Sequence, residues 1–367
     1  MRAAVLRDVR RIDVADIPEP EPVGADSVLV EIGAVGVCGS DVLRFGVGKG
    51  YGFPLVLGHE MSGTVLEASA DGSVQPGDRV AIFPCLPDPA DPMSEIGEYA
   101  LGSAYDYFGS RRDGGLQELL RVPARNLFRL REDVSLIEGA LVEPAGVALH
   151  AVRKAPVPPN ATALVIGAGP IGLLAAQWLR VGGVFRVLVA DIDPRKRRIA
   201  ERLGFEAIDP TDTGSDVIAT ELTGGRGVDI AVEASGLAVT FLQAIHATAH
   251  RGHVVLLGDL SNDVALSKET VSRVLRRELT LHGTWNARIA PRGNSEWDMV
   301  VAAVGRTVNV RDLVSDVAPF EDAQRVFEDL ADRRVWANKT VFAVSEAART
   351  EAPGLLDKSA SHAEAKR

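Results

Sequence analysis

The sequence predicts an α/β protein of two domains, the first mostly β and the second built on a doubly wound parallel sheet. A chain of 367 residues is too long for one ordinary hydrophobic core. Up to about residue 150, short β-like runs such as 27–35 and 61–68 are separated by Gly, Pro and Asp. Beyond a proline-rich linker at 157–160, strand-like and helix-like segments alternate, as they do in parallel α/β units.

Short apolar segments flanked by helical or glycine-rich sequence predict the strands of the parallel sheet. Buried parallel strands read as such continuous apolar runs. They lie at residues 163–166, 186–191, 230–232, 253–258 and 279–283. After Asn286 we expect a helix over 319–332 and a last strand over 340–344 that returns to the first domain.

This order of elements predicts an inserted domain. Residues 1–155 and 287–346 would form one domain, and residues 156–286 would form the other. Residues 347–367 are rich in Ala, Glu, Lys and Ser without apolar periodicity, so we expect them to form a disordered tail.

Charge and composition exclude several classes of partner. The net charge of -10, without any basic block, argues against nucleic acid or an anionic membrane surface. The apolar stretch 163–179 is interrupted by glycines and Pro170 and is too short to span a membrane. Only Cys38 and Cys85 are present, which is not the framework of a secreted disulfide protein. We therefore expect a cytoplasmic protein that acts on small molecules.

A glycine-rich turn follows the first strand of the predicted parallel sheet and opens a helix. Such a turn binds a dinucleotide, because its glycines permit a tight turn and close backbone approach to a pyrophosphate at a helix N-terminus. Asp191 stands at the end of the next strand, where a carboxylate accepts hydrogen bonds from ribose hydroxyls and repels a 2′-phosphate, which favours NAD over NADP. The turn comprises Gly167, Gly169, Pro170, Ile171 and Gly172.

Four side chains have the chemistry of a metal site. Thiolate, imidazole and carboxylate together suit Zn²⁺. Their spacing alone does not distinguish a metal site from a buried cysteine and a histidine of the core. The residues are Cys38 in Cys38-Gly39-Ser40-Asp41, His59 and Glu60 in Gly58-His59-Glu60, and Glu143 in Val142-Glu143-Pro144.

In this order, these segments and the Gly167 turn resemble the zinc-containing medium-chain dehydrogenase/reductase family, up to about Val344. The resemblance implies a GroES-like β-rich catalytic domain interrupted by a Rossmann NAD-binding domain. Residues 105–115 and 275–280 resemble the galactitol-1-phosphate dehydrogenase-like enzymes of the polyol branch. The implied activity is that of an NAD-dependent zinc dehydrogenase for a secondary hydroxyl of a polyol, sugar phosphate, cyclitol or aminocyclitol.

The resemblance also assigns roles to residues. It implies that one catalytic zinc ion is held by Cys38, His59, Glu60 and Glu143, and that Ser40 takes the proton of the substrate hydroxyl. Three thiolate or carboxylate charges on a dication would make it a poor Lewis acid, so we expect Glu60 or Glu143 to exchange with water or substrate. Glu60 as an outer partner of the ligands is the alternative. Around the cofactor we expect Asp191, Lys196, Gly258 and Trp285.

Two features depart from the family pattern. Many relatives hold a second, structural zinc on four cysteines. Because hard carboxylates and a phenol suit zinc poorly, we expect no structural zinc here. Relatives also often carry a histidine relay where this chain has Leu43, so the proton must leave through water or another group. The four structural positions read Cys85, Asp88, Asp91 and Tyr99.

Substrate contacts and the rival functions stay open at this level. Five side chains in two glycine-rich loops are candidates for binding phosphate or hydroxyls, although surface charge explains them equally well. The alternatives are a zinc-free NADPH-dependent reductase of the same superfamily and a non-catalytic NAD-binding protein. By analogy we expect a homodimer or homotetramer. The five candidates are Arg44, Lys49, Tyr51, Arg111 and Arg112.

Overall fold

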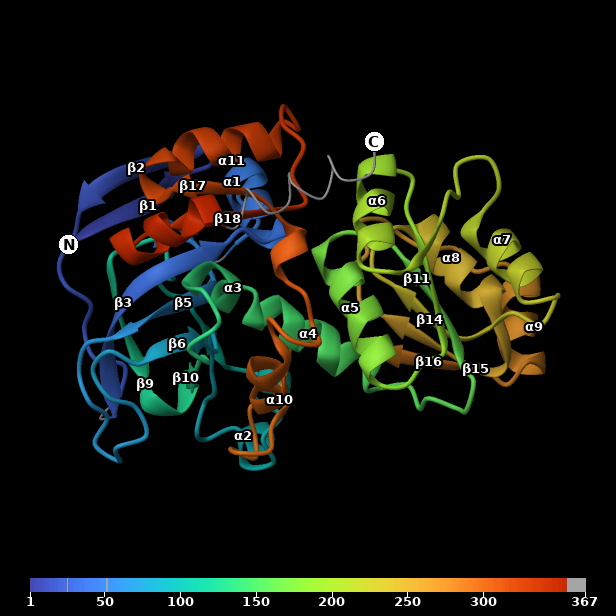
Figure 1. Ribbon diagram of the computed structural model, residues 1–367, viewed down its shortest axis with the longest axis horizontal. Helices are drawn as coiled ribbons and strands as arrows, with labels where there is room; N and C mark the ends of the chain where they lie inside the picture. The colour runs from blue at the N-terminus through green and yellow to red at the C-terminus, as the bar shows by residue number, and fades with distance from the viewer. Residues whose placement is uncertain (25, 51, 355–367) are drawn as a thin grey trace. The chain divides into compact units, whose positions relative to one another are not determined.

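The computed structural model describes residues 1–24, 26–50 and 52–354. The chain forms two compact units (Figure 1). The second unit begins at Pro144, in the first turn of helix α4 (Val142–Val152). This boundary is earlier than the predicted one at residue 156, since most of α4 belongs to the second unit. The first unit comprises Met1–Glu143, Arg288–Arg306 and the described part of Val310–Arg367, and the second comprises Pro144–Ala287 and Thr307–Asn309.

The first unit is built on a seven-stranded sheet. Its central strand β3 is flanked by β5 on one side and by β18 on the other, and β9 also pairs with it. The predicted last strand, β18, therefore does return to the sheet that contains β3. A small second sheet has the order β2-β1-β4. The strands are β1 (Arg2–Asp8), β2 (Arg11–Asp16), β3 (Ser27–Gly36), β4 (Leu55–Val56), β5 (Glu60–Val65), β6 (Arg79–Ile82), β9 (Leu119–Pro123), β10 (Leu127–Arg129), β17 (Val314–Pro319) and β18 (Lys339–Ala343).

Aromatic packing fixes helix α1 of the first unit, which starts at Gly39, directly after Cys38. The ring of Phe327 in α11 lies 5.6 Å from the ring of Phe45 in α1 and 5.8 Å from that of Phe342 in β18. All three rings are fully buried, so they hold α1 and α11 against the sheet. Figure 1 shows these two helices side by side. The helices are α1 (Gly39–Val47), α2 (Pro92–Glu95), α3 (Leu136–Ala140), α10 (Glu296–Ala303) and α11 (Ala323–Ala331), with 3-10 turns η1 (Tyr99–Leu101), η2 (Ala124–Asn126), η3 (Arg311–Leu313) and η4 (Phe320–Asp322).

The second unit is a six-stranded parallel sheet in the order β13-β12-β11-β14-β15-β16. This is the order of a Rossmann dinucleotide fold. Helices α5 and α6 lie on one side of the sheet and α7, α8 and α9 on the other (Figure 1). The short edge strand β13 has no apolar run, which is why the sequence pattern missed it. The elements are β11 (Thr162–Ile166), α5 (Pro170–Val181), β12 (Arg186–Ala190), α6 (Pro194–Arg202), β13 (Glu206–Ile208), α7 (Ser215–Leu222), β14 (Val228–Glu233), α8 (Ala238–Ala247), β15 (Thr248–Leu256), α9 (Lys268–Arg276) and β16 (Thr280–Gly283).

The predicted disordered tail is wrong for residues 347–354, which belong to a helix that runs from 346 to 354. Tertiary contacts that composition does not reveal anchor this helix. Arg349 pairs with Glu321 at 2.8 Å, and Glu351 pairs with Arg79 at 2.6 Å. Residues 355–367 lie outside the described residues. Within the described ranges, the helices are too short or too polar to cross a lipid bilayer.

A lobe at residues 85–107 carries the positions that resemble a structural zinc site. Its strands β7 (Cys85–Leu86) and β8 (Asp106–Tyr107) pair with Cys85 opposite Tyr107. Burial raises the pKa of the Cys85 thiol to about 12, so the thiol is neutral. Asp91 caps α2 by accepting a hydrogen bond from Met93 N at 2.8 Å. It also accepts from Ser103 N at 2.7 Å and from Ser103 Oγ at 3.0 Å.

Because Asp91 joins two segments of the lobe, Asp91→Ala should lower the unfolding temperature by a few degrees at neutral pH. The matched control Asp88→Ala removes a carboxylate that accepts a hydrogen bond from nearby Ala90 N at 2.9 Å, within one segment of the lobe, and should change the unfolding temperature much less. Hydrogen bonds from Met93 and Ser103 lower the pKa of Asp91. Its stabilising effect is therefore present above its ordinary value of 3.8 and is lost as the pH falls through the lowered value. Thermal unfolding followed by circular dichroism at several pH values measures this, and equal losses in both variants would contradict it.

Candidate active site

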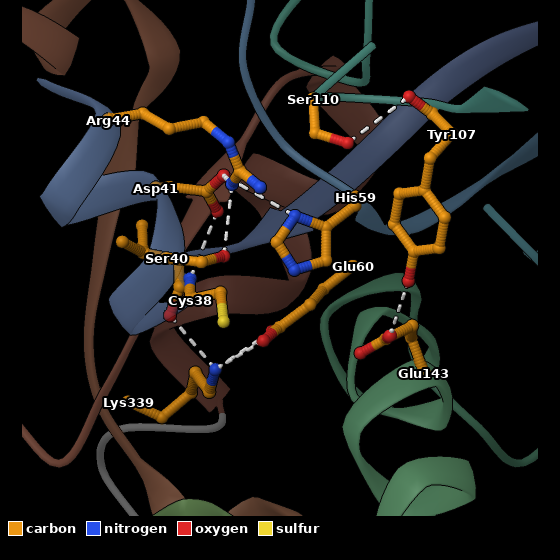
Figure 2. A network of polar contacts seen from close by, with 11 residues as sticks. Cys38, Ser40, Asp41, Arg44, His59, Glu60, Tyr107, Ser110, Glu143 and Lys339 are labelled. Atoms are coloured by element: carbon orange, nitrogen blue, oxygen red, sulfur yellow. Dashed lines mark hydrogen bonds and ion pairs between the residues drawn. The ribbon is translucent and has the colours of Figure 1, made fainter. Parts of the chain in front are cut away.

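Three ligating atoms come together where β3, α1 and β5 meet (Figure 2). Cys38 lies two residues after the end of β3 and caps α1, whereas His59 precedes β5 and Glu60 begins it. The antiparallel register places Gly36 opposite Glu60, which brings both strand ends to the same place. The ligand atoms of Cys38, His59 and Glu60 all lie within 4.8 Å of one another. We call these three residues the ligand group.

Glycines keep the backbone of the ligand group close-packed. A Cβ at Gly36 would lie 2.0 Å from Glu60 Oε2, so a side chain there would displace the carboxylate. Gly58 has a φ of +97° that residues with side chains rarely adopt, and a Cβ there would lie 2.5 Å from Val35. Gly115 N donates to Gly58 O at 2.8 Å. The loop that contains residues 109–115 thus supports the backbone that carries His59.

A buried carboxylate orients His59. Its Nδ1 lies 3.3 Å from Asp41 Oδ1, and its other ring nitrogen points toward the Cys38 sulfur (Figure 2). A carboxylate behind a ligating histidine fixes the ring and its tautomer. Burial disfavours a protonated His59, but the Asp41 carboxylate and the Cys38 thiol outweigh it and raise the pKa of His59. A metal ion would therefore have to displace a proton.

Asp41 also contacts the helix and its neighbour Arg44. Asp41 Oδ2 accepts a hydrogen bond from Cys38 N at 3.2 Å, and Arg44 NH1 lies 3.2 Å from Oδ1. Burial raises the pKa of Asp41, but the charges and hydrogen bonds of His59 and Arg44 outweigh it, and the net pKa is lowered. The sequence analysis gave Asp41 no role. Its place three residues after Cys38, where a carboxylate caps a helix, was the available signal.

Lys339 is a second functional residue that sequence reasoning missed. Its Nζ lies 2.8 Å from both carboxylate oxygens of Glu60 and donates to Val37 O at 2.9 Å. The two side chains are only 5% and 2% exposed. Burial disfavours the ammonium form, but Glu60 and Cys38 outweigh it and raise the pKa of Lys339. A buried positive charge therefore faces Glu60 beside the ligand group.

Glu143, the fourth predicted ligand, does not join the ligand group. It stands in the first turn of α4, where Tyr107 Oη donates a hydrogen bond to its Oε1 at 3.2 Å. Burial raises the pKa of Glu143 to about 7, against the lowering effect of nearby His59. The structure thus brings three of the four predicted ligands together and pairs the fourth with a phenol that the sequence analysis did not single out.

The donor set of the ligand group fits a zinc ion. One sulfur, one imidazole nitrogen and one carboxylate oxygen are ligand types that zinc takes in proteins, at about 2.0–2.3 Å from each donor. Donors within 4.8 Å of one another reach a shared ion after small side-chain adjustments. Three ligands leave a tetrahedral ion one open position, which is the arrangement of a catalytic site.

The other residues predicted near the metal differ in their surroundings. Ser40 Oγ accepts a hydrogen bond from Arg44 Nη1 at 3.0 Å. Leu43, also on α1, is 47% exposed. Arg112 pairs with Asp106 at 2.5 Å, and the guanidinium of Arg111 lies 4.1 Å from the ring centre of Tyr105. Both arginines therefore brace their own loop. Lys49 is exposed, and Tyr51 lies outside the described residues.

The predicted dinucleotide turn in the second unit has the geometry its glycines require. Gly167 has a φ of +104°, and a Cβ at Gly172 would lie 1.8 Å from Gly167 O. Gly169 caps α5 with open space around it, Pro170 is the first helical residue, and Ile171 follows it. The free backbone N–H groups of such a helix start attract a phosphate group.

Asp191 is joined directly to this turn. Its Oδ2 accepts from Ala168 N at 2.8 Å, and Lys196 Nζ lies 3.9 Å from the same oxygen. Gly258 packs against the backbone of Gly236, because a Cβ there would lie 2.3 Å from Gly236 N. Trp285 follows β16 and is 55% exposed.

Sequence reasoning missed Glu233, which is fully buried at the end of β14. It accepts hydrogen bonds from Ser235 N at 2.9 Å, Gly236 N at 3.0 Å and Thr240 Oγ1 at 2.9 Å. A Cβ at Gly167 would touch Ser235 N at 3.1 Å. Glu233 therefore holds the loop that packs on the glycine turn.

Lys339→Met should destabilise the metal-free protein by about 3–5 kcal/mol, because it leaves the Glu60 charge buried without a partner. Zinc should recover part of that loss, since the ion gives Glu60 a new positive partner. The double variant Glu60→Gln/Lys339→Met removes both charges and should be more stable than Lys339→Met alone. Chemical denaturation with and without zinc measures each free energy of unfolding. A single variant as stable as the unaltered protein would refute the argument.

Comparison with known proteins tests the resemblance. The Alcohol dehydrogenase GroES-like domain matches residues 24–132, and the Zinc-binding dehydrogenase domain matches residues 170–306. Galactitol 1-phosphate 5-dehydrogenase of Escherichia coli strain K12 is 32% identical over 324 residues, covering 87% of this chain and 93% of the relative. Sorbitol dehydrogenase of Bos taurus is 33% identical over 328 residues, covering 87% and 89%.

Solved structures agree with these sequence matches. Galactitol-1-phosphate dehydrogenase from Escherichia coli superposes with a TM-score of 0.87 at 30% identity, covering 94% of this chain and 100% of that chain. A zinc-binding dehydrogenase from Sinorhizobium meliloti 1021 bound to NADP gives 0.84 at 28% identity, covering 94% and 99%. The predicted fold class and family are confirmed: the chain belongs to the zinc-binding dehydrogenases of the medium-chain dehydrogenase/reductase family, beside its polyol dehydrogenases.

Proposed function

We propose that this protein is an NAD-dependent zinc dehydrogenase that oxidises a secondary hydroxyl of a polyol, sugar phosphate or cyclitol, or runs the reverse reaction. The observation that carries the proposal is the ligand group, in which a cysteine, an oriented histidine and a glutamate converge within 4.8 Å. The similarity to enzymes named for galactitol 1-phosphate and sorbitol supports a polyhydroxylated substrate.

In this mechanism Cys38, His59 and Glu60 would hold the zinc ion. Zinc bound there supplies Lewis acidity, which lowers the pKa of a hydroxyl group. Ser40 takes the substrate proton on its Oγ, whose position is fixed by the hydrogen bond from Arg44. Leu43 has no titratable group, so the path beyond Ser40 runs through water or another group. Lys339 and Arg44 offset the carboxylate charges of Glu60 and Asp41.

The cofactor we propose is NAD. Asp191 is fixed at the end of β12 by the backbone N–H of Ala168, and its charge favours ribose hydroxyls over a 2′-phosphate. Gly167, Gly169 and Gly172 admit the pyrophosphate to the start of α5. Nicotinamide supplies the hydride acceptor, and the protein supplies its orientation.

We also propose that the lobe holds no structural zinc. Asp91 already accepts three hydrogen bonds, and the Cys85 thiol is neutral and fully buried. A cysteine binds zinc as the thiolate, which the neutral Cys85 does not provide, and the oxygens of Asp91 are already used by their hydrogen-bond donors. A fully loaded protein should therefore contain one zinc ion per chain.

The decisive test is an NAD⁺ reduction screen on zinc-loaded protein with galactitol, galactitol 1-phosphate, sorbitol, myo-inositol and aminocyclitols. NADH should form with at least one of them, faster than NADPH forms from NADP⁺. A chelator should abolish turnover, and Ser40→Ala should lower kcat by roughly 100-fold or more. Turnover without metal and with preference for NADP⁺ would establish the zinc-free reductase instead. Tight NADH binding without turnover of any compound would establish a non-catalytic NAD-binding protein.

We further propose that the chain forms a homodimer through β16. This strand ends the sheet of the second unit, and its Leu281 is 38% exposed. An open edge can pair with its own copy about a two-fold axis. Light scattering should give twice the chain mass, and Leu281→Arg should give monomers. Leu222→Arg is a matched control, since Leu222 is equally exposed but lies on α7. A monomeric unaltered protein would contradict the proposal.

A further inference from the structure

Glu60 of the ligand group and its neighbour Glu143 are held by partners of unequal strength. Glu60 is paired through both oxygens with the Lys339 ammonium at 2.8 Å, in a charge-assisted contact. Glu143 accepts one hydrogen bond from the neutral Tyr107 phenol at 3.2 Å. The weaker partner leaves Glu143 as the carboxylate that competes for a metal ion.

Tyr107 reaches Glu143 from the lobe that resembles a structural zinc site. It lies on β8 opposite Cys85 of β7, and its ring centre is 5.9 Å from that of His59. Figure 2 shows the phenol oxygen directed at Glu143 and the Glu60 carboxylate directed at Lys339. The phenol therefore stands beside the histidine of the ligand group and donates a hydrogen bond to the carboxylate that lies outside it.

A buried carboxylate without a hydrogen-bond donor is costly, so it seeks the nearest positive charge. A zinc ion held by the ligand group would supply such a charge. Glu143 would then occupy the open coordination position and add a third negative charge to the thiolate and Glu60. A substrate oxygen would then bind less readily, because Glu143 occupies the coordination position. It would also be less activated, because the added negative charge makes the ion a weaker Lewis acid.

We propose that Tyr107 is a positioning residue that keeps the Glu143 carboxylate out of the direct ligand set and thereby leaves the coordination position open for substrate. The inference rests on the proposed zinc dehydrogenase function. The phenol hydroxyl, and not the aromatic ring, would hold the Glu143 carboxylate in place.

Tyr107→Phe removes the hydroxyl and keeps the ring. Glu143 should then bind the ion, so zinc should dissociate to a chelator more slowly, by roughly 10-fold, the size of effect typical of outer partners of metal ligands. In the cobalt-substituted protein the visible absorption bands should shift, because the coordination of the ion changes. The kcat should fall with the active substrate, since each turnover must displace the carboxylate.

Two further variants separate positioning from mere packing. Glu143→Gln weakens the competing ligand, so Tyr107→Phe/Glu143→Gln should match Glu143→Gln in cobalt spectrum and in rate of metal loss. Tyr105→Phe removes a neighbouring phenol whose ring contacts Tyr107, at 6.2 Å between ring centres, and should leave the cobalt spectrum unchanged. The unfolding temperature of each metal-loaded variant is measured as well, and variants are compared where these temperatures agree.

An unchanged cobalt spectrum and an unchanged rate of metal loss in Tyr107→Phe would overturn the proposal. So would faster metal loss, or an effect of Tyr107→Phe that persists in full on the Glu143→Gln background. Failure of the unaltered protein to bind cobalt or zinc would instead refute the proposed function, and the two failures are therefore distinguishable.

Discussion

The Asp41 carboxylate is the group on which the site depends. It accepts from the Cys38 backbone, faces His59 Nδ1 and pairs with Arg44, whose guanidinium also donates to Ser40. One buried side chain thus links Cys38, His59 and, through Arg44, Ser40, which are the residues proposed to bind the metal or to take the proton. Since α1 is fixed by the packing of Phe45 on Phe327, the geometry of the site follows from the core of the first unit.

Charge compensation is the second constraint. Burying a carboxylate is expensive unless a cation or hydrogen-bond donors face it. Glu60 is met by Lys339, Asp41 by Arg44 and His59, and Glu233 in the second unit by a set of hydroxyl and backbone donors. Each of these three buried carboxylates therefore has positively charged groups or hydrogen-bond donors of its own.

The sequence was sufficient for features that are local or that a family resemblance carries. The glycine turn was predictable because strand, turn and helix follow one another within 167–172, and Asp191 because it ends the next strand. The ligand group was assigned by resemblance, as its spacing alone was not decisive. Lys339 was missed because it lies 279 residues from Glu60, and Tyr107 because only the fold brings it to Glu143. The helix at 346–354 was missed because distant ion pairs stabilise it.

The position of Lys339 on β18 has a consequence for biosynthesis. Cys38, His59 and Glu60 leave the ribosome early, whereas Lys339 emerges only after the whole of the inserted second unit has been made. Until then Glu60 lacks its ammonium partner, and β3 lacks β18, one of the strands that pair with it. The charge pairing and the strand pairing around Cys38, His59 and Glu60 are therefore completed only when the last part of the first unit has been made.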